Sequence, residues 1–271
     1  MRRLVYDLGM HCGEDTAFYL DRGFDVVGVE ANPYLVEQLR EAFAAELRSG
    51  QLRLVDKAIN VRPGRARFLV SSVSVWGTLT NAFAERNADE GAAVEEIEVE
   101  CVTFDEVLRE HGMPYYLKMD IEGAESCCLD TLRQFTERPN YISLESCATS
   151  PGSGFVATLR ELRALQELGY RRFRYCDQAT IPGRTVDLIG EGPPMRHTFA
   201  AHSSGPFGRD LHGGWHRPAA AAMRGLLLRA VDDACGHNGR LQGRKGMWRL
   251  KRIRTWLTGR REHWYDLHAA L

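Results

Sequence analysis

The residue types best suited to ligand chemistry gather near the start of the chain. Asp7 stands two places before Gly9, and Gly13 follows, which makes a D-x-G-x-x-x-G loop. Glu30 comes about twenty residues after Gly9, the spacing at which nucleotide-binding βαβ units place an acid on a ribose. Glycines also let the backbone approach a ligand closely. The stretch therefore predicts a site for a nucleotide-like cofactor.

The residues of this loop narrow the choice of ligand. A dinucleotide fingerprint needs a middle glycine that residues 9–13 (GMHCG) lack, and a Walker loop needs a Gly-Lys-Ser/Thr ending that is also missing there. Asp7 would repel a pyrophosphate, whereas it suits a cationic aminoacyl group. We therefore expect S-adenosylmethionine, which joins an amino acid tail, a sulfonium and an adenosine. An NAD-linked oxidoreductase is disfavoured, and a turn used only for packing is the structural alternative.

Strand and helix patterns surround the loop. The apolar run at 4–8 predicts a buried strand, residues 14–16 (EDT) predict a helix start, and residues 24–29 predict the returning strand. Asn32 and the proline after it predict the N-cap and first turn of a second helix, which should run over 33–47. The cofactor loop is therefore expected between two strands of one sheet.

The same alternation continues over about 190 residues and predicts an α/β fold with a doubly wound, mainly parallel sheet. Further strands are expected at 52–58, 66–70, 99–102, 115–120, 141–145, 172–176 and 186–190. Helices are expected from residue 103, where T-x-x-E predicts a capping box, and at 155–168. We expect residues 71–81 to form an irregular loop and the acidic stretch 85–100 a solvated connector.

Carboxylates recur where the predicted strands end. Glu30, Asp56, Asp120 and Glu145 each fall at the carboxyl end of a predicted strand. Ligands of such sheets bind beyond these ends. Strands that serve only the core do not need acids there, so the sequence predicts a site along one edge of the sheet.

Two segments together resemble the FkbM family of S-adenosylmethionine-dependent methyltransferases. The first is VYDLGMHCGEDT with VVGVEANP, and the second is VTFDEVLREHG leading into YLKMDIEGAE. The resemblance covers residues 4–145 and implies a Rossmann-like class I methyltransferase fold. It also implies methyl transfer to oxygen on natural products, sugars or related metabolites. One departure is His11-Cys12, where the family more often has Ala-Asn.

The resemblance assigns roles to matching positions. It implies that Asp7, Gly9 and Gly13 form the cofactor loop, that Glu30 binds the ribose, that Asp56 and Ala58 flank the adenine, and that Asp120 faces the methyl-transfer site. The full set of expected cofactor-binding residues is Asp7, Gly9, His11, Gly13, Asp15, Thr16, Glu30, Asn32, Asp56, Lys57, Ala58 and Asp120. Enzymes that methylate base amines carry an Asn/Asp-Pro-Pro-aromatic turn after the fourth strand, whereas this chain has DIEG at 120–123. Oxygen is therefore the expected acceptor atom.

Methyl transfer to a neutral hydroxyl requires a group that takes its proton. The candidate catalytic residues are Asp120, Glu145 and His202, since an imidazole with a pKa of about 6.5 suits this task. Asp120, Glu122 and Glu145 could instead hold Mg²⁺, which takes oxygen ligands. For Glu122 the alternative is a role at the start of the following helix.

The C-terminal part has a different composition. We expect residues 1–196 to form the methyltransferase domain and 197–271 a basic helical extension. Residues 240–261 contain nine Lys or Arg and no acid, with Trp and Leu interleaved at near-helical spacing. This pattern predicts a helix packed on the core, or a lid or homo-oligomer interface that holds an acidic or phosphorylated acceptor. Nucleic acid is weakly indicated, because the formal net charge is only −1.

Composition bounds the remaining possibilities. Seven cysteines without a Cys-x-x-Cys pair favour reduced thiols over a disulfide framework, and no apolar run has the roughly 18 residues of a membrane span. We therefore expect a cytoplasmic protein with no membrane partner. The expected function is S-adenosylmethionine-dependent O-methyl transfer to a small-molecule acceptor in natural-product or sugar metabolism. The alternative is a catalytically idle cofactor-binding module whose basic tail docks a partner.

Overall fold

The structure is a computed structural model that describes residues 3–71, 77–78, 94–121, 123–148, 154–235 and 264–271. The chain divides into two compact units. Unit 1 comprises Met1–Ile142 and Ile189–Met195, and unit 2 comprises Ser143–Leu188 and Arg196–Leu271. This division differs from the predicted one at residue 196, because unit 2 takes in residues from both sides of that point, whereas unit 1 ends at Met195.

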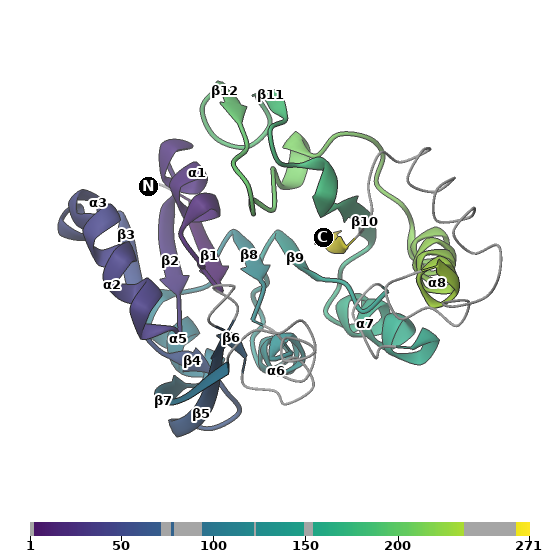
Figure 1. Ribbon diagram of the computed structural model, residues 1–271. Helices are drawn as coiled ribbons and strands as arrows, with labels where there is room; N and C mark the ends of the chain where they lie inside the picture. Colours follow the sequence, from purple (N-terminus) through teal and green to yellow (C-terminus); the bar gives the residue numbers. More distant parts are fainter. Residues whose placement is uncertain (1–2, 72–76, 79–93, 122, 149–153, 236–263) are drawn as a thin grey trace. The chain divides into compact units, whose positions relative to one another are not determined.

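Unit 1 contains most of the predicted strand–helix alternation (Figure 1). Its elements are β1 (Leu4–Leu8), α1 (Glu14–Asp21), β2 (Asp25–Val29), α2 (Pro33–Ala42), α3 (Ala44–Ser49), β3 (Leu52–Val55), β4 (Ala58–Ile59), β5 (Gly64–Ser71), β6 (Gly77–Thr78), β7 (Val94–Val102), α5 (Phe104–His111), β8 (Tyr116–Met119) and α6 (Glu125–Leu132). Strand β9 (Tyr141–Glu145) begins in unit 1 and ends in unit 2.

Four strands of unit 1 form a parallel sheet in the order β8-β1-β2-β3, which confirms the predicted mainly parallel sheet. The central strands are buried along nearly their whole length, as their apolar runs require. In the register, Leu8 pairs with Val29 on one side and with Met119 on the other. The carboxyl ends of β1, β2 and β8 therefore meet at one edge, where the glycine loop begins.

A second sheet of unit 1, in the order β4-β7-β5-β6, contains the strands expected at 66–70 and 99–102, but the sequence did not predict that they form a separate sheet. Strand β7 pairs antiparallel with β5 and includes 94–100, so the prediction of a solvated connector is wrong there. The acids alternate with Ile97, Val99 and Cys101, and this period of two buries one face while the glutamates stay outside. A small apolar cluster lines this sheet: Ala58, Phe68, Val70, Val99 and Cys101. The rest of the connector, 85–93, lies outside the described residues.

Other boundaries differ from the patterns in smaller ways. The helix expected over 33–47 is interrupted at Phe43, whose φ of −109° and ψ of 28° leave the helical region, so that α2 and α3 are separate. The strand expected over 52–58 ends at Val55, and Ala58 instead pairs with Cys101 in the second sheet. The expected strand 66–70 is confirmed within β5, and the predicted capping box of Thr103 with Glu106 is present at the start of α5. Of the predicted loop 71–81, residues 77–78 pair with β5 as β6.

Unit 2 combines strands β13 and β10, next to the end of β9, with two helices. Its remaining elements are α7 (Phe155–Glu167), β10 (Arg172–Asp177), a 3-10 turn (Gln178–Thr180), β11 (Thr185–Leu188), β12 (Met195–Thr198), a second 3-10 turn (Gly208–Asp210), α8 (Pro218–Cys235) and β13 (Tyr265–Ala270). Strand β13 lies between β9 and β10 and runs antiparallel to β10. Helix α8 packs against α7 and β10. The prediction of an outer strand at 172–176 is thereby confirmed.

The predicted extension 197–271 is not a separate appendage to the sheet. Its last described segment, β13, is a strand of the sheet with neighbours on both sides. The strand expected at 186–190 is β11, which pairs with β12 in a two-stranded sheet of its own (Figure 1). The basic segment 240–261 lies outside the described residues.

Two expectations concern the chain as a whole. All six cysteines whose side chains are described are free, as the reduced-thiol interpretation predicts. Among the described residues, none of the helices combines the length and the apolar character that crossing a membrane requires.

A buried histidine in unit 2 should make its stability depend on pH. Burial of His268 on β13, with Arg174 opposite, lowers its pKa to about 3. Because the unfolded value is about 6.5, this contribution is complete above pH 6.5 and is lost as the pH falls toward 3. We expect wild-type protein to lose about 1–2 kcal/mol more than His268→Gln between pH 7 and pH 5, measured by urea unfolding. Replacement of the exposed His212 by Gln is the control, and an unchanged pH slope in His268→Gln would contradict the assignment.

Candidate functional site

The loop between β1 and α1 is held against the end of β2 by backbone hydrogen bonds. The amides of Gly9 and Met10 both donate to the carbonyl oxygen of Val29, at 2.9 and 3.1 Å. Gly9, His11 and Gly13 have positive φ angles of 82°, 54° and 86°. Glycine accepts such angles without cost, whereas His11 is held there by the turn around it.

Gly9 is required by close packing as well as by conformation. A Cβ atom on Gly9 would lie 1.9 Å from the carbonyl oxygen of Asp120, the residue after β8. A Cβ atom on Gly28, on β2, would lie 2.0 Å from the sulfur of Met10, so there the Met10 side chain would have to move. At Gly9 the loop is therefore pressed onto the end of β8 at a distance that only glycine permits.

Glu30, directly after β2, links the glycine loop to the start of α2. One carboxylate oxygen accepts from the amide of His11 at 2.9 Å, and the other accepts from the amide of Asn32 at 2.8 Å. The side chain of Asn32 in turn caps α2 by accepting from the amide of Tyr34 at 3.0 Å, as predicted. Burial raises the pKa of Glu30, and hydrogen bonds from the amides of Asn32, His11 and Ala31 oppose this by favouring the charged form. A carboxylate has about four acceptor sites, so three amides leave it capacity for a ligand hydroxyl.

A buried cation lies directly beneath the loop. Lys118 on β8 is the lateral neighbour of Asp7 on β1, and its ammonium lies 3.0 Å from Asp7 Oδ1. The same nitrogen lies 3.6 Å from Asp15 Oδ2 and 3.9 Å from Asp120 Oδ2, and it donates to the carbonyl oxygen of Gly9 at 3.4 Å. We call Lys118, Asp7, Asp15 and Asp120 the Lys118 cluster.

The charges of the cluster keep Lys118 protonated. Burial by itself would lower the pKa of Lys118, but Asp7, Asp15 and Asp120 together raise it well above its ordinary value. Sequence patterns gave Lys118 no role, although a lysine within the apolar run at 115–119 was a usable signal. A lysine is almost never fully buried unless it is paired.

Three predicted cofactor contacts are turned into the protein. Asp7 is fully buried, and its second oxygen accepts from the hydroxyl of Thr16 at 2.7 Å. Asp15 and Thr16, in the first turn of α1, are buried as well. These side chains shape the loop from below, so their direct contact with a cofactor remains a prediction.

The turn after β8 presents Asp120 at the edge of the sheet. Its side chain is 49% exposed, whereas the Lys118 side chain is only 5% exposed. Glu125, the first residue of α6, holds this turn by accepting from the amides of Ile121 and Gly123 at 3.1 and 3.0 Å. Burial raises the pKa of Glu125, and the nearby Asp120 adds to this shift. Glu122 lies outside the described residues.

The residues expected at the adenine lie just beyond β3. Asp56 is half exposed and forms an ion pair with Arg40 at 2.7 Å, and Lys57 forms one with Glu100 at 3.4 Å. Ala58 is buried in the second sheet. The adenine contacts of these three residues remain predictions.

The other two predicted catalytic residues belong to unit 2. Glu145 ends β9, and the turn after it is held by Glu161, whose carboxylate accepts from the amide of Cys147 at 2.6 Å and from the hydroxyl of Ser146 at 3.2 Å. His202 is exposed and has a positive φ of 66°. Their participation in the chemistry of Asp120, which lies in unit 1, remains a prediction.

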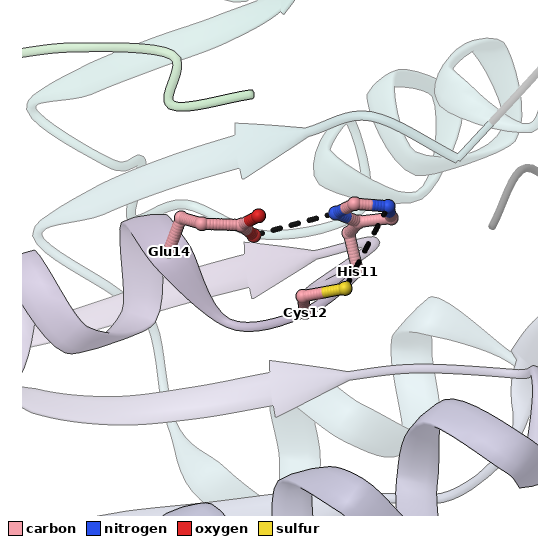
Figure 2. A group of neighbouring side chains, drawn as sticks. All are labelled: His11, Cys12 and Glu14. Atoms are coloured by element: carbon pink, nitrogen blue, oxygen red, sulfur yellow. Dashed lines mark hydrogen bonds and ion pairs between the residues drawn. The ribbon is translucent and has the colours of Figure 1, made fainter. Parts of the chain in front are cut away.

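One group of potential metal ligands lies in the loop itself. Figure 2 shows the imidazole of His11 between the carboxylate of Glu14, 3.3 Å from Nδ1, and the thiol of Cys12, 3.9 Å from Nε2. Within the described residues this is the only group of three such side chains. A thiol and an imidazole do not suit Mg²⁺, so the Mg²⁺ prediction finds no support there.

The parallel sheet, the glycine turn after β1 and the acid after β2 define a Rossmann-like methyltransferase of class I. A comparison with known families gives the particular group: the family described as "Methyltransferase FkbM domain" matches residues 7–172. The chain therefore belongs to the FkbM methyltransferase family, as the two sequence segments indicate. The comparison with curated proteins found no match.

The chain is also similar to several solved structures. They include precorrin-6y C5,15-methyltransferase from Geobacter metallireducens GS-15, with 11% identity, a TM-score of 0.36 and coverage of 73% of this chain and 76% of that one. A putative rRNA-methylase from Clostridium thermocellum has 11% identity, a TM-score of 0.37 and coverage of 72% and 83%. A putative sarcosine dimethylglycine methyltransferase from Galdieria sulphuraria has 8% identity, a TM-score of 0.38 and coverage of 99% and 77%.

The residues at this sheet edge fit the cofactor that the family implies, S-adenosylmethionine. Glu30 keeps acceptor capacity for ribose hydroxyls, and Asp120 offers a half-exposed carboxylate at the neighbouring strand end. The glycine loop lies between them. Glu30 would hold the ribose, the loop would hold the aminoacyl part, and Asp120 would face the sulfonium.

Proposed function

We propose that this protein is an S-adenosylmethionine-dependent O-methyltransferase that acts on a hydroxyl group of a small molecule, such as a sugar or a natural-product intermediate. The observation that carries the proposal is the meeting of Glu30 and Asp120 at one sheet edge, on either side of the glycine loop. Membership of the FkbM family supports methyl transfer. The choice of oxygen rests on residues 120–123 (DIEG), which lack the turn of amine-methylating enzymes.

The chain would contribute positioning and proton transfer. Bound S-adenosylmethionine supplies an activated methyl group, and in-line alignment of the acceptor then contributes most to the rate. Asp120 is the proposed base, because its carboxylate is accessible and lies at the start of the turn that Glu125 holds. It would take the hydroxyl proton at a carboxylate oxygen as the oxygen attacks. Glu145 and His202 are the alternative bases.

The experiment is calorimetric titration of the protein with S-adenosylmethionine and S-adenosylhomocysteine, followed by a product assay over a panel of hydroxylated acceptors. Binding of both ligands and formation of a methyl ether with one acceptor would support the proposal. Binding without turnover on any acceptor would favour the idle module, whose basic tail would dock a partner. No binding of either ligand would overturn both.

Replacement of Glu30 should weaken cofactor binding. Glu30→Ala removes an acceptor for the ribose and leaves the amides of His11 and Asn32 without their carboxylate, so we expect a loss of about 1.5–3 kcal/mol, or roughly 10- to 150-fold in Kd. Calorimetric titration with S-adenosylhomocysteine measures this. Glu30→Gln keeps one acceptor and should lose less, and Glu37→Ala, on an exposed side chain of α2, is the control. An unchanged Kd in Glu30→Ala would contradict the ribose assignment.

The proposal also covers the binding partners of the protein and its location in the cell. The acceptor could be acidic or phosphorylated if the basic segment 240–261 contributes to its binding, and the same segment could form a homo-oligomer interface. We propose a cytoplasmic location and no nucleic-acid partner. Size-exclusion chromatography with light scattering, on full-length protein and on a variant with neutral residues at 240–261, tests the interface.

A further inference from the structure

The Lys118 cluster is buried at one end and exposed at the other. The side chains of Asp7, Asp15 and Lys118 are at most 5% exposed, whereas that of Asp120 is 49% exposed. Asp120 is therefore the only member through which the cluster meets a ligand. A half-exposed carboxylate at a strand end can turn toward water unless something holds it. The ammonium of Lys118, 3.9 Å from Asp120 Oδ2, is placed to hold it.

The cluster also has more negative than positive groups. Three carboxylates surround one ammonium, which leaves a formal charge of −2 (three minus one), and Glu125 lies near Asp120 on the adjacent turn. In this partly desolvated setting the excess charge attracts a cation at Asp120 more strongly than it would in water. A neutral ligand of the same shape gains no binding energy from this excess negative charge.

We propose that Lys118 is a positioning residue that makes the site selective for a positively charged ligand, by fixing Asp120 and the Gly9 carbonyl relative to the buried Asp7. This inference rests on the proposed function, in which the cofactor carries a sulfonium and its product a neutral thioether. A site that prefers the charged cofactor over the neutral product would release the product and bind the next cofactor molecule.

The test compares two non-reacting ligands by calorimetric titration. Sinefungin carries a protonated amine in place of the sulfonium, and S-adenosylhomocysteine carries the neutral thioether. We expect wild-type protein to bind sinefungin more tightly, and Asp120→Asn to reduce this preference by about fivefold or more. Lys118→Arg keeps the buried charge but cannot reproduce the position of the ammonium, so the preference should fall here too. Asp130→Asn, on an exposed side chain of α6, is the matched control and should change nothing.

A double-mutant cycle separates positioning from a general effect. If Lys118 acts through Asp120, the variant with both Lys118→Arg and Asp120→Asn should show no lower preference than Asp120→Asn alone. Additive losses, or a Lys118→Arg variant with the wild-type preference or a higher one, would overturn the proposal. Asp15→Asn is the second variant if Lys118→Arg does not fold. This substitution removes one ion-pair partner of Lys118 and leaves the ion pair between Lys118 and Asp7. We expect Asp15→Asn to lower the preference for sinefungin as well.

The titrations of wild-type protein distinguish a failure of the proposed function from a failure of the selectivity proposal. If wild-type protein binds neither ligand, the cofactor assignment is wrong. If it binds both with equal Kd, the cofactor assignment holds and the selectivity of the Lys118 cluster is refuted.

Discussion

Gly9→Ala should destabilise the protein by roughly 2–5 kcal/mol and abolish cofactor binding. An alanine at a φ of 82° costs about 1–2 kcal/mol by itself. Its Cβ would also lie 1.9 Å from the Asp120 carbonyl oxygen, so the loop and the end of β8 would have to move apart, which adds an overpacking cost of about 1–3 kcal/mol. Urea unfolding and calorimetric titration with S-adenosylhomocysteine measure the two losses.

Gly50→Ala is a matched control for this prediction. Gly50 ends α3 with a similar φ of 75°, but a Cβ there would meet nothing within 4 Å. It should therefore lose only the conformational part, about 1–2 kcal/mol, and bind the ligand normally. Equal losses in the two variants would mean that close packing at Gly9 is unimportant.

Lys118→Met should destabilise the protein by about 3–5 kcal/mol, because it leaves buried carboxylates without their counter-ion. Total stabilities are about 5–15 kcal/mol, so the variant could be largely unfolded at 37 °C. Since the pKa of Lys118 is raised on folding, its contribution is complete below the unfolded value of about 10.4 and is lost only as the pH rises through the folded value. The difference between wild type and variant should thus be the same at pH 7 and pH 9 in urea unfolding.

Lys57→Met provides the comparison for this charge. Lys57 also pairs with a glutamate, Glu100 at 3.4 Å, but its side chain is 40% exposed and that of its partner 60%. Exposed pairs contribute about 0–1 kcal/mol, so the variant should be nearly as stable as wild type. A Lys118→Met variant as stable as Lys57→Met would show that the buried cluster does not need its cation.

Local patterns were sufficient for the elements that carry the candidate site. The apolar run of β1, the positive-φ glycines and the acid after β2 are short-range features, so their spacing predicted the loop and the place of Glu30. The N-cap at Asn32 and the capping box at Thr103 were predictable for the same reason. Alternation of strands and helices likewise predicted the mainly parallel sheet.

The acidic strand β7 shows where composition misled. Residues 94–100 are rich in glutamate, which favours a solvated connector, yet Ile97 and Val99 recur with the period of a strand. The apolar face of β7 is buried because β7 pairs with β5 in an antiparallel sheet. This pairing requires the chain to fold back on itself, which the composition of β7 does not indicate. Similarly, β13 enters the sheet beside β10, about ninety residues earlier in the chain, which is an example of a pairing that local propensity does not specify.

Sequence alone determined the family, the glycine loop and the acid after β2, because each depends on residues close together in the chain. Only the tertiary structure decided that Asp7 is buried and that Lys118 is its partner, since the two are 111 residues apart. Their contact follows from the pairing of β1 with β8, which sets Asp7 beside Lys118 in the register. A buried charge must find its counter-ion among spatial neighbours, and strand order determines those neighbours.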